Sequence, residues 1–384
     1  MLLFCCSVYP LSAAGQIADA DLSSQKKQPA KKAPAPAPQK KAGPPPREKF
    51  TLAEQNAAII PDIPDARFFA DSEADFLRVV PPTPGPWLAL SSGGADGAFG
   101  AGIIVGLSEI GKRPDFTMVT GVSTGALMAP FVFLGSKYDD RLRDGYTTIT
   151  AADIFELGGK GESFFDTWPL KDLIAKRVTP ELLNDVAAQH RNGRRLIVVT
   201  TNLDAERPTA WNMGAIAAKG GDKALKLFRD ILLAASAIPG VFPPVLIDVE
   251  ANGRKIQEMH GDGGLDNQFF IAPQKMLIST SSARLPATDL YVIINTTLTP
   301  NFHPTERDTI SILGRGISVG VRTLTRIMID QAHAAAKRNG IGFHLATIDP
   351  AFNAPSRGAF DPDYMKALFK FGSEQARSGL AFRQ

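Results

Sequence analysis

Cysteine is almost absent from this chain. Cys5 and Cys6 are its two cysteines among 384 residues, and they are neighbours close to the first residue. Adjacent cysteines rarely form a disulfide with each other, so the sequence predicts no disulfide framework. A cysteine nucleophile and a cysteine-ligated zinc site are excluded from the rest of the chain, which has no cysteine at all.

Long apolar runs and an excess of charge are absent from most of the chain as well. Beyond the first 14 residues, no apolar run reaches the length of about 18 residues that predicts a membrane-spanning helix. Residues 1–50 hold eight basic and three acidic residues, whereas the remainder holds 34 basic and 36 acidic ones. This near-neutral remainder argues against a nucleic-acid-binding surface spread over the domain. The 44% of hydrophobic and 21% of charged residues are typical of a globular protein.

Composition divides the chain into a leader (residues 1–20), a linker (21–49) and a body (50–384). Residues 1–14 are apolar and small, like the central region of a secretory signal peptide, and small residues at 12–14 and 18–20 offer cleavage sites. The linker alternates proline, alanine and lysine, which predicts a disordered segment that cannot bury a core.

The leader predicts export, although it lacks the positive residues that usually begin a signal peptide. The exported protein would be periplasmic, secreted, or anchored to a membrane through a lipid on Cys5 or Cys6; a cytoplasmic protein is the alternative. The lysines of the linker favour a membrane surface as a partner, and a solvated spacer is the alternative interpretation.

The body alternates predicted strands with predicted helices, which favours an α/β fold with a mostly parallel central sheet and helices on both faces. Asn252-Gly253 between two apolar runs predicts a β-hairpin. Strands are expected at residues 87–90, 116–119, 195–200, 245–249, 255–259, 290–294 and 343–348, and helices at 98–110, 126–134, 223–238, 310–337 and 363–377.

Glycines flank a serine between a predicted strand and a predicted helix, in Gly121-Val122-Ser123-Thr124-Gly125. This G-x-S-x-G pattern is typical of a nucleophile elbow, a tight turn that exposes the serine hydroxyl. The helix that begins there directs N–H groups toward developing negative charge. A glycine-rich turn with a helix-capping serine is the alternative. We interpret Ser123 as a nucleophile.

A second loop of small residues, SSGGADGAFG at 91–100, also joins a predicted strand to a predicted helix. Its uncovered N–H groups can converge on an anion. A dinucleotide-binding loop is one interpretation, because Gly94 and Gly97 fit G-x-G-x-x-G, but Ser92 occupies the first glycine position. An oxyanion hole needs only about two donors aimed at one oxygen, and the nearby serine elbow favours it.

A carboxylate lies between glycines in His260-Gly261-Asp262-Gly263-Gly264, directly after the predicted hairpin. Small neighbours let such a carboxylate approach another backbone, where it can act as the general base for a serine. An ordinary Asp-Gly turn is the alternative.

Together, these segments and the block ASAIPGVFPPV at 235–245 resemble the patatin-like phospholipase family, in the same order, over residues 87–300. The resemblance implies a three-layer α/β sandwich and a lipid acyl hydrolase of phospholipase A type. It implies Ser123 as the nucleophile and Asp262 as its only partner, a dyad without histidine. The oxyanion donors would be Gly93, Gly94 and Ala95, and the motif glycines would be Gly97, Gly121, Gly125, Gly263 and Gly264. No metal or organic cofactor is implied; the substrate would be a phospholipid or another acyl lipid, and nothing indicates an oligomeric state.

Two residues depart from the family pattern. Ser92 stands where glycine is usual, and a serine would be strained there if the position requires a positive φ. Asp96 stands where arginine or lysine is common, and a carboxylate aimed at an oxyanion hole would oppose its charge. We therefore expect Asp96 to point away from the hole and to cap the following helix.

Two other functions stay open. A Ser-His-Asp carboxylesterase would draw its base from the five histidines, His190, His260, His303, His333 and His344. A catalytically silent lipid-binding module would retain the fold without turnover. An acyl chain needs an apolar trough, for which residues 138–190 are the expected cap. Its candidate lining residues are Phe131, Phe133, Phe164, Phe165, Trp168, Phe242, Phe269 and Phe270.

Overall fold

The computed structural model describes residues 46–158, 161–278, 284–300, 302 and 304–383. The leader at 1–20, and all of the linker at 21–49 except its last four residues, lie outside this part of the chain. The expectations of an export signal, a lipidated cysteine and a disordered linker therefore stay predictions.

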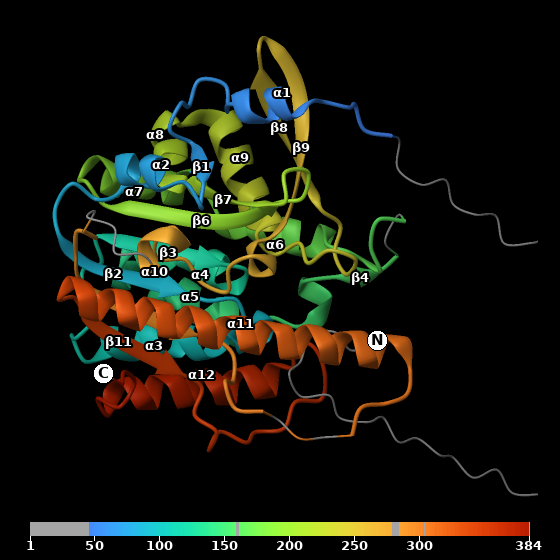
Figure 1. The fold of residues 1–384 in the computed structure, drawn as a ribbon. Helices are drawn as coiled ribbons and strands as arrows, with labels where there is room; N and C mark the ends of the chain where they lie inside the picture. Colours follow the sequence, from blue (N-terminus) through green and yellow to red (C-terminus); the bar gives the residue numbers. More distant parts are fainter. Residues whose placement is uncertain (1–45, 159–160, 279–283, 301, 303, 384) are drawn as a thin grey trace, which may run out of the picture.

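Five parallel strands form most of the main sheet and reach one of its edges, and antiparallel strands extend it on the other side (Figure 1). In spatial order the strands are β1 (Arg67–Phe69), β7 (Arg207–Asn212), β6 (Arg195–Asn202), β3 (Met118–Val122), β2 (Gly85–Leu90), β10 (Ala287–Ile294) and β11 (Gly342–Thr347). β6, β3, β2, β10 and β11 are mutually parallel, so their carboxyl ends meet at one edge of the sheet.

A hairpin of β8 (Val245–Ala251) and β9 (Arg254–Asp262) joins this sheet at the carboxyl end of β6. Asn252 and Gly253 both have positive φ, 53° and 78°, as a two-residue hairpin turn requires, so the predicted hairpin is confirmed. The last residues of β9 pair antiparallel with β6, and Asp262 lies opposite Thr200.

Helices cover both faces of the sheet, which makes the three-layer α/β sandwich expected from the sequence. Successive β2 residues alternate between two cores: Leu88 and Leu90 face one, Trp87 and Ala89 the other. The first core is covered mainly by α3 (Gly97–Glu109), α4 (Thr124–Leu134), α5 (Asp139–Thr147), α7 (Pro180–Arg191), α8 (Met213–Lys219), α9 (Gly221–Ala234) and α12 (Pro362–Arg377). The second is covered by α2 (Glu73–Val79), α10 (Gln274–Ile278) and α11 (Thr309–Asn339).

The stretch between α4 and β6 is more structured than the sequence predicted. Besides α5 and α7, it contains α6 (Trp168–Arg177) and a small antiparallel pair, β4 (Glu156–Leu157) and β5 (Phe165–Asp166). The helix expected over 223–238 ends at Ala234. In place of the last predicted turn, the backbone forms hydrogen bonds that span three residues instead of four. These run from Ser236 N to Leu233 O and from Ala237 N to Ala234 O. Among the helices within the described ranges, none is both long and apolar enough to cross a membrane.

A buried ion pair ties the first described segment to the strand that ends at Asp262. Arg67 in β1 donates two hydrogen bonds to Glu258 in β9, and Gln55 in α1 (Leu52–Ala57) donates a third at 2.6 Å. Burial alone would raise the pKa of Glu258, but the hydrogen bonds from His260 and Arg67 outweigh it and lower this pKa to about 2. The carboxylate therefore stays ionised inside the protein.

Removing one partner of this pair should leave an uncompensated buried charge. We expect Arg67→Met to lower the free energy of unfolding by about 3–5 kcal/mol in urea titrations. Arg78→Met is the matched control, because Arg78 is 68% exposed and pairs with Asp75 at the surface. It should change stability by less than about 0.5 kcal/mol. Equal losses in both variants would show that the Arg67–Glu258 pair does not stabilise this region.

Candidate active site

Ser123 occupies a strained turn between β3 and α4. Its φ of 54° and ψ of −125° lie outside the regions that non-glycine residues normally adopt. A Cβ atom at Gly121 would lie 2.4 Å from the carbonyl oxygen of Gly125, and one at Gly125 would lie 2.3 Å from the carbonyl oxygen of Leu90. The two glycines of the G-x-S-x-G pattern are thus required by close backbone packing on both sides of the serine.

Asp262 reaches Ser123 through the pairing of three strands. β3 is parallel to β6 with Val122 opposite Val199, and the next residue of β6, Thr200, lies opposite Asp262. The Ser123 Oγ donates a hydrogen bond of 2.6 Å to Asp262 Oδ2. The amide of Gly264 donates one of 2.7 Å to Asp262 Oδ1. Both side chains are buried, so the sheet brings together two residues that are far apart in the sequence.

The protonation of Asp262 follows from this environment. Burial raises the pKa of its carboxyl to about 6, against the opposing effect of the hydrogen bonds from Ser123 and the Gly264 amide. Asp262 is therefore ionised at neutral pH yet basic enough to accept a proton.

The glycine loop after β2 lies beside the elbow. A Cβ atom at Gly97 would lie 2.4 Å from Thr124 Oγ1, and one at Gly93 would lie 2.1 Å from the carbonyl oxygen of Asn295. Gly94 has a φ of 58° and lines the same cavity as Ser123. Gly94 and Ala95 form a 3-10 turn, Gly94–Asp96, that leads into α3.

Asn295, which the sequence analysis missed, holds the start of this loop. It follows β10 and is fully buried. Its backbone amide donates to Ser91 Oγ at 2.7 Å, its side-chain amide donates to Ser91 O at 3.0 Å, and its Oδ1 accepts from Gly100 N at 3.1 Å. Its only sequence signal is its place at the end of an apolar strand, which does not reveal the partner loop.

Ser92 is not strained, so the strain considered for this position is absent. Among the described non-glycine residues, those with positive φ are Asp62, Ser123, Glu206, Asn252 and Phe360. Ser92 instead donates its hydroxyl proton to Gln268 Oε1, and its amide donates to Gln268 O at 2.8 Å. The side-chain amide of Gln268 donates to Gly264 O. Gln268 therefore clamps the glycine loop to the Gly264 segment that holds Asp262.

Asp96 does not cap α3, which corrects the expectation for this residue. It occupies the N-cap position, but its side chain makes no capping hydrogen bond. Its Oδ1 instead accepts a 2.8 Å hydrogen bond from the Tyr364 hydroxyl of α12. Burial raises the pKa of Asp96 to about 7, against the opposing effect of this hydrogen bond.

None of the four described histidines hydrogen-bonds to Ser123 or Asp262; His303 lies outside the described residues. His260 is buried with Thr200 Oγ1 at 2.9 Å from Nδ1 and Glu258 Oε2 at 3.2 Å from Nε2. His344 bonds to Asp289, and His333 stacks on Phe343. His190 packs beside Gly214. In the described ranges, no group of three or more His, Cys, Asp or Glu side chains could hold a metal ion.

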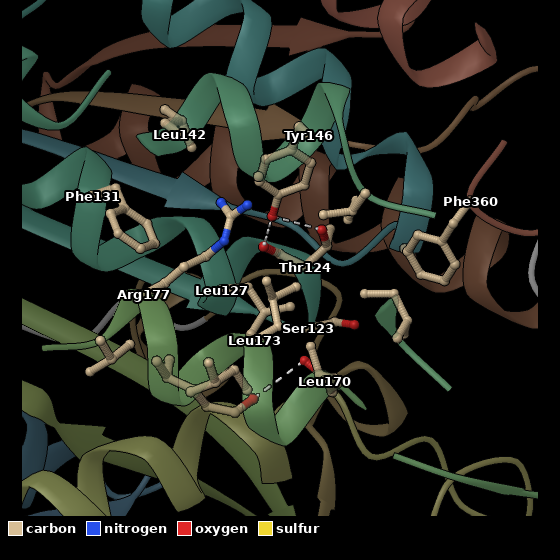
Figure 2. Close-up of a pocket in the computed structure, with 18 of the residues that line it drawn as sticks. Ser123, Thr124, Leu127, Phe131, Leu142, Tyr146, Leu170, Leu173, Arg177 and Phe360 are labelled. Carbon is tan, nitrogen blue, oxygen red and sulfur yellow. Dashed lines mark hydrogen bonds between the residues drawn. The ribbon is translucent and has the colours of Figure 1, made fainter. Parts of the chain in front are cut away.

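A largely apolar cavity begins at Ser123 and extends between α4, α5 and α6 (Figure 2). Residues 138–190, the expected cap, supply about half of its lining, with Leu142, Leu170 and Leu173 among the apolar side chains. Polar groups are few: the Tyr146 hydroxyl donates to Thr124 O at 2.7 Å, and Arg177 extends from α6 toward Tyr146.

Of the aromatic residues expected to line a trough, Phe131 and Phe242 do so. Phe165 is buried and packs on Phe242, whereas Phe133, Phe269 and Phe270 belong to the cores. Phe164 and Trp168 are exposed. Phe360 also lines the cavity, with a φ of 52° that is rare for a bulky residue, and was not foreseen.

About half of the chain matches a known protein family. Residues 88–273 match the sequence model of the family described as "Patatin-like phospholipase". Residues 88–273 therefore form a patatin-like phospholipase domain, and this match implies lipid acyl hydrolase activity. No curated protein matches the chain. One similar solved structure is the crystal structure of VipD from Legionella pneumophila, with 13% identity, a TM-score of 0.40, and coverage of 82% of this chain and 70% of that chain. At this level of likeness it carries no argument about fold or activity.

Breaking the Gln268 clamp should destabilise the site. In Gln268→Met the Ser92 hydroxyl and the Gly264 carbonyl lose their buried partner, so we expect unfolding free energy to fall by about 1–3 kcal/mol in urea titrations. Gln274→Met, at an exposed glutamine, is the control and should change it by less than about 0.5 kcal/mol. Identical stability of Gln268→Met and wild type would contradict the clamp.

Proposed function

We propose that this protein hydrolyses carboxylic esters of acyl lipids with a Ser123–Asp262 dyad and an acyl-enzyme intermediate. The observation that carries the proposal is the 2.6 Å hydrogen bond from Ser123 Oγ to Asp262 Oδ2 at an apolar cavity. A serine next to a base with a raised pKa is an activated nucleophile, and the cavity supplies an environment for an acyl chain.

In the first half of the reaction, Ser123 Oγ forms a bond to the ester carbonyl carbon while its proton passes to Asp262 Oδ2. The tetrahedral intermediate then collapses, the bond to the leaving alcohol breaks, and Asp262 returns the proton to that alcohol. In the second half, water attacks the acyl-serine ester and gives a proton to Asp262. The fatty acid leaves as Ser123 Oγ takes this proton back, which restores the resting site.

The oxyanion of each tetrahedral intermediate would be stabilised by backbone N–H groups of Gly93, Gly94 and Ala95. The contact of Gly97 with Thr124 and the place of Gly94 at the Ser123 cavity support this role, because they put the loop next to the elbow. Fixed dipoles of this kind stabilise a developing negative charge without reorganisation. Asp96 does not oppose them in our scheme, since its carboxyl is engaged by Tyr364.

The cavity favours a long acyl chain as the group that is transferred. Leu127, Leu170 and Leu173 lie beside Ser123 in Figure 2, and Phe360 borders the opposite side. These side chains offer apolar contacts to methylene groups and exclude water from the acyl ester. The Ser-His-Asp scheme has less support, because the described histidines are bonded or packed elsewhere.

Replacing either member of the dyad should abolish turnover. We expect Ser123→Ala to lose labelling by a fluorophosphonate probe and to lower lipid hydrolysis at least about 1000-fold, and Asp262→Asn to lower it about 100- to 10,000-fold. Products from a mixed lipid panel would be measured by mass spectrometry. Ser373→Ala is the control, because Ser373 is buried but lies outside the cavity. A folded wild-type protein without a Ser123 adduct would instead indicate the silent lipid-binding module.

The pH dependence should follow the ionisation of Asp262. Because the protonated carboxyl cannot accept the serine proton, kcat/KM for a soluble ester should be half-maximal near pH 6, where its pKa of about 6 lies. Below that it should fall about tenfold per pH unit. Asp96→Asn tests the assignment, since the pKa of Asp96 is raised to about 7. The acidic limb should persist in this variant; its disappearance would mean that Asp96, not Asp262, governs the profile.

A further inference from the structure

The first half of α11 presents an apolar face to solvent. Ile312, Leu313, Ile317, Val319 and Ile327 are between 48% and 58% exposed. At about 100° per residue they share one side of the helix. Gly316 and Gly320 lie on the same side, and a Cβ atom added to either would meet no other atom within 4 Å. The second half of α11 is anchored, since Ile329, Ala332, Ala335 and Ala336 belong to the second core. Exposed apolar residues gathered in this way mark an interaction surface.

Positive charge borders this α11 face. Residues 309–329 contain no acidic residue and three arginines. The half-buried Arg315 and the exposed Arg326 lie along one edge of the face at helical spacing, whereas Arg322 is buried beside them. Arg322 donates to Thr297 O at 3.2 Å, and the exposed Arg326 donates to Leu298 O. Within the described ranges, neither of these two arginines pairs with a carboxylate. An apolar face with arginine at its edge is typical of a helix that lies in the surface of an anionic membrane.

A second group of exposed apolar residues flanks the candidate active site. This rim cluster consists of Leu157, Phe164, Trp168 and Leu265, all between 49% and 70% exposed. Leu265 follows Asp262 by three residues, and Trp168 begins α6, whose Leu170 and Leu173 line the cavity. In Figure 1 the β4 segment and the first turns of α11 project on the same side of the molecule.

We propose that the α11 face and the rim cluster dock on an anionic lipid bilayer, with the Ser123 cavity open toward the lipid. A second copy of the chain fits this face less well, because a symmetric contact would place the arginine edge against itself. The orientation of the cavity rests on the proposed function, whereas the docking of α11 is measurable without turnover.

The test is vesicle flotation of Ser123→Ala protein, which binds without hydrolysing the vesicle. The probe is phosphatidylcholine vesicles with about 30% phosphatidylglycerol, compared with vesicles of phosphatidylcholine alone. We expect stronger binding to the anionic vesicles, and an at least about fivefold loss in the triple variant Ile312→Ser/Leu313→Ser/Ile317→Ser. Arg326→Gln should weaken binding to the anionic vesicles only. Leu52→Ser/Leu380→Ser, at apolar residues that are 74% and 67% exposed elsewhere, should bind like the parent protein.

Unchanged binding of the triple variant would overturn the docking proposal. So would a dimer, seen by sedimentation, that the triple variant dissociates while vesicle binding stays constant. In the active background, the triple variant should keep its turnover of a soluble monomeric ester and lose turnover of vesicle lipid. Vesicle binding without hydrolysis of any ester would contradict the proposed function and leave the docking surface standing, so the two failures are distinguishable.

Discussion

The hydrogen bond between Ser123 and Asp262 is the interaction around which the molecule is organised, because its two ends come from separate parts of the sheet. β3 delivers the serine into a turn with φ of 54°, and β9 delivers the aspartate by pairing with the end of β6. The strain of that turn is maintained by packing on both sides, where glycines allow backbones to touch. The buried Arg67–Glu258 pair ties the same strand β9 to β1. Position and protonation of the aspartate thus share one cause, burial at the edge of a rigid sheet.

The departures from the family pattern turn out to be built into the site. Ser92 stands at a position where glycine is usual, and its hydroxyl donates a hydrogen bond to Gln268. This contact links the glycine loop to the segment that holds Asp262. Asp96 stands at a position where a basic residue is common, and its carboxyl accepts a hydrogen bond from Tyr364 of α12. Both side chains thus bond to residues far away in the sequence, and these bonds are compatible with a site that keeps its geometry.

Segments beyond the family match at residues 88–273 complete the site. Asn295 anchors the glycine loop, Phe360 borders the cavity and Tyr364 engages Asp96. α11 adds an apolar surface that faces solvent, and we propose that this surface contacts lipid.

Local sequence determined the class of fold, the family and the residue types at the centre of the site. The alternation of apolar runs with glycine-rich turns is a local signal, and so is G-x-S-x-G, because each reports backbone geometry within a few residues. β7 was not predicted, since RPTAWN gains its strand conformation by pairing with β6. Asn295, Gln268, Phe360 and the Tyr364–Asp96 contact were decided only by tertiary structure. Their roles depend on partners far away in the chain, and the residues next to a side chain in the sequence do not indicate which distant group it will contact.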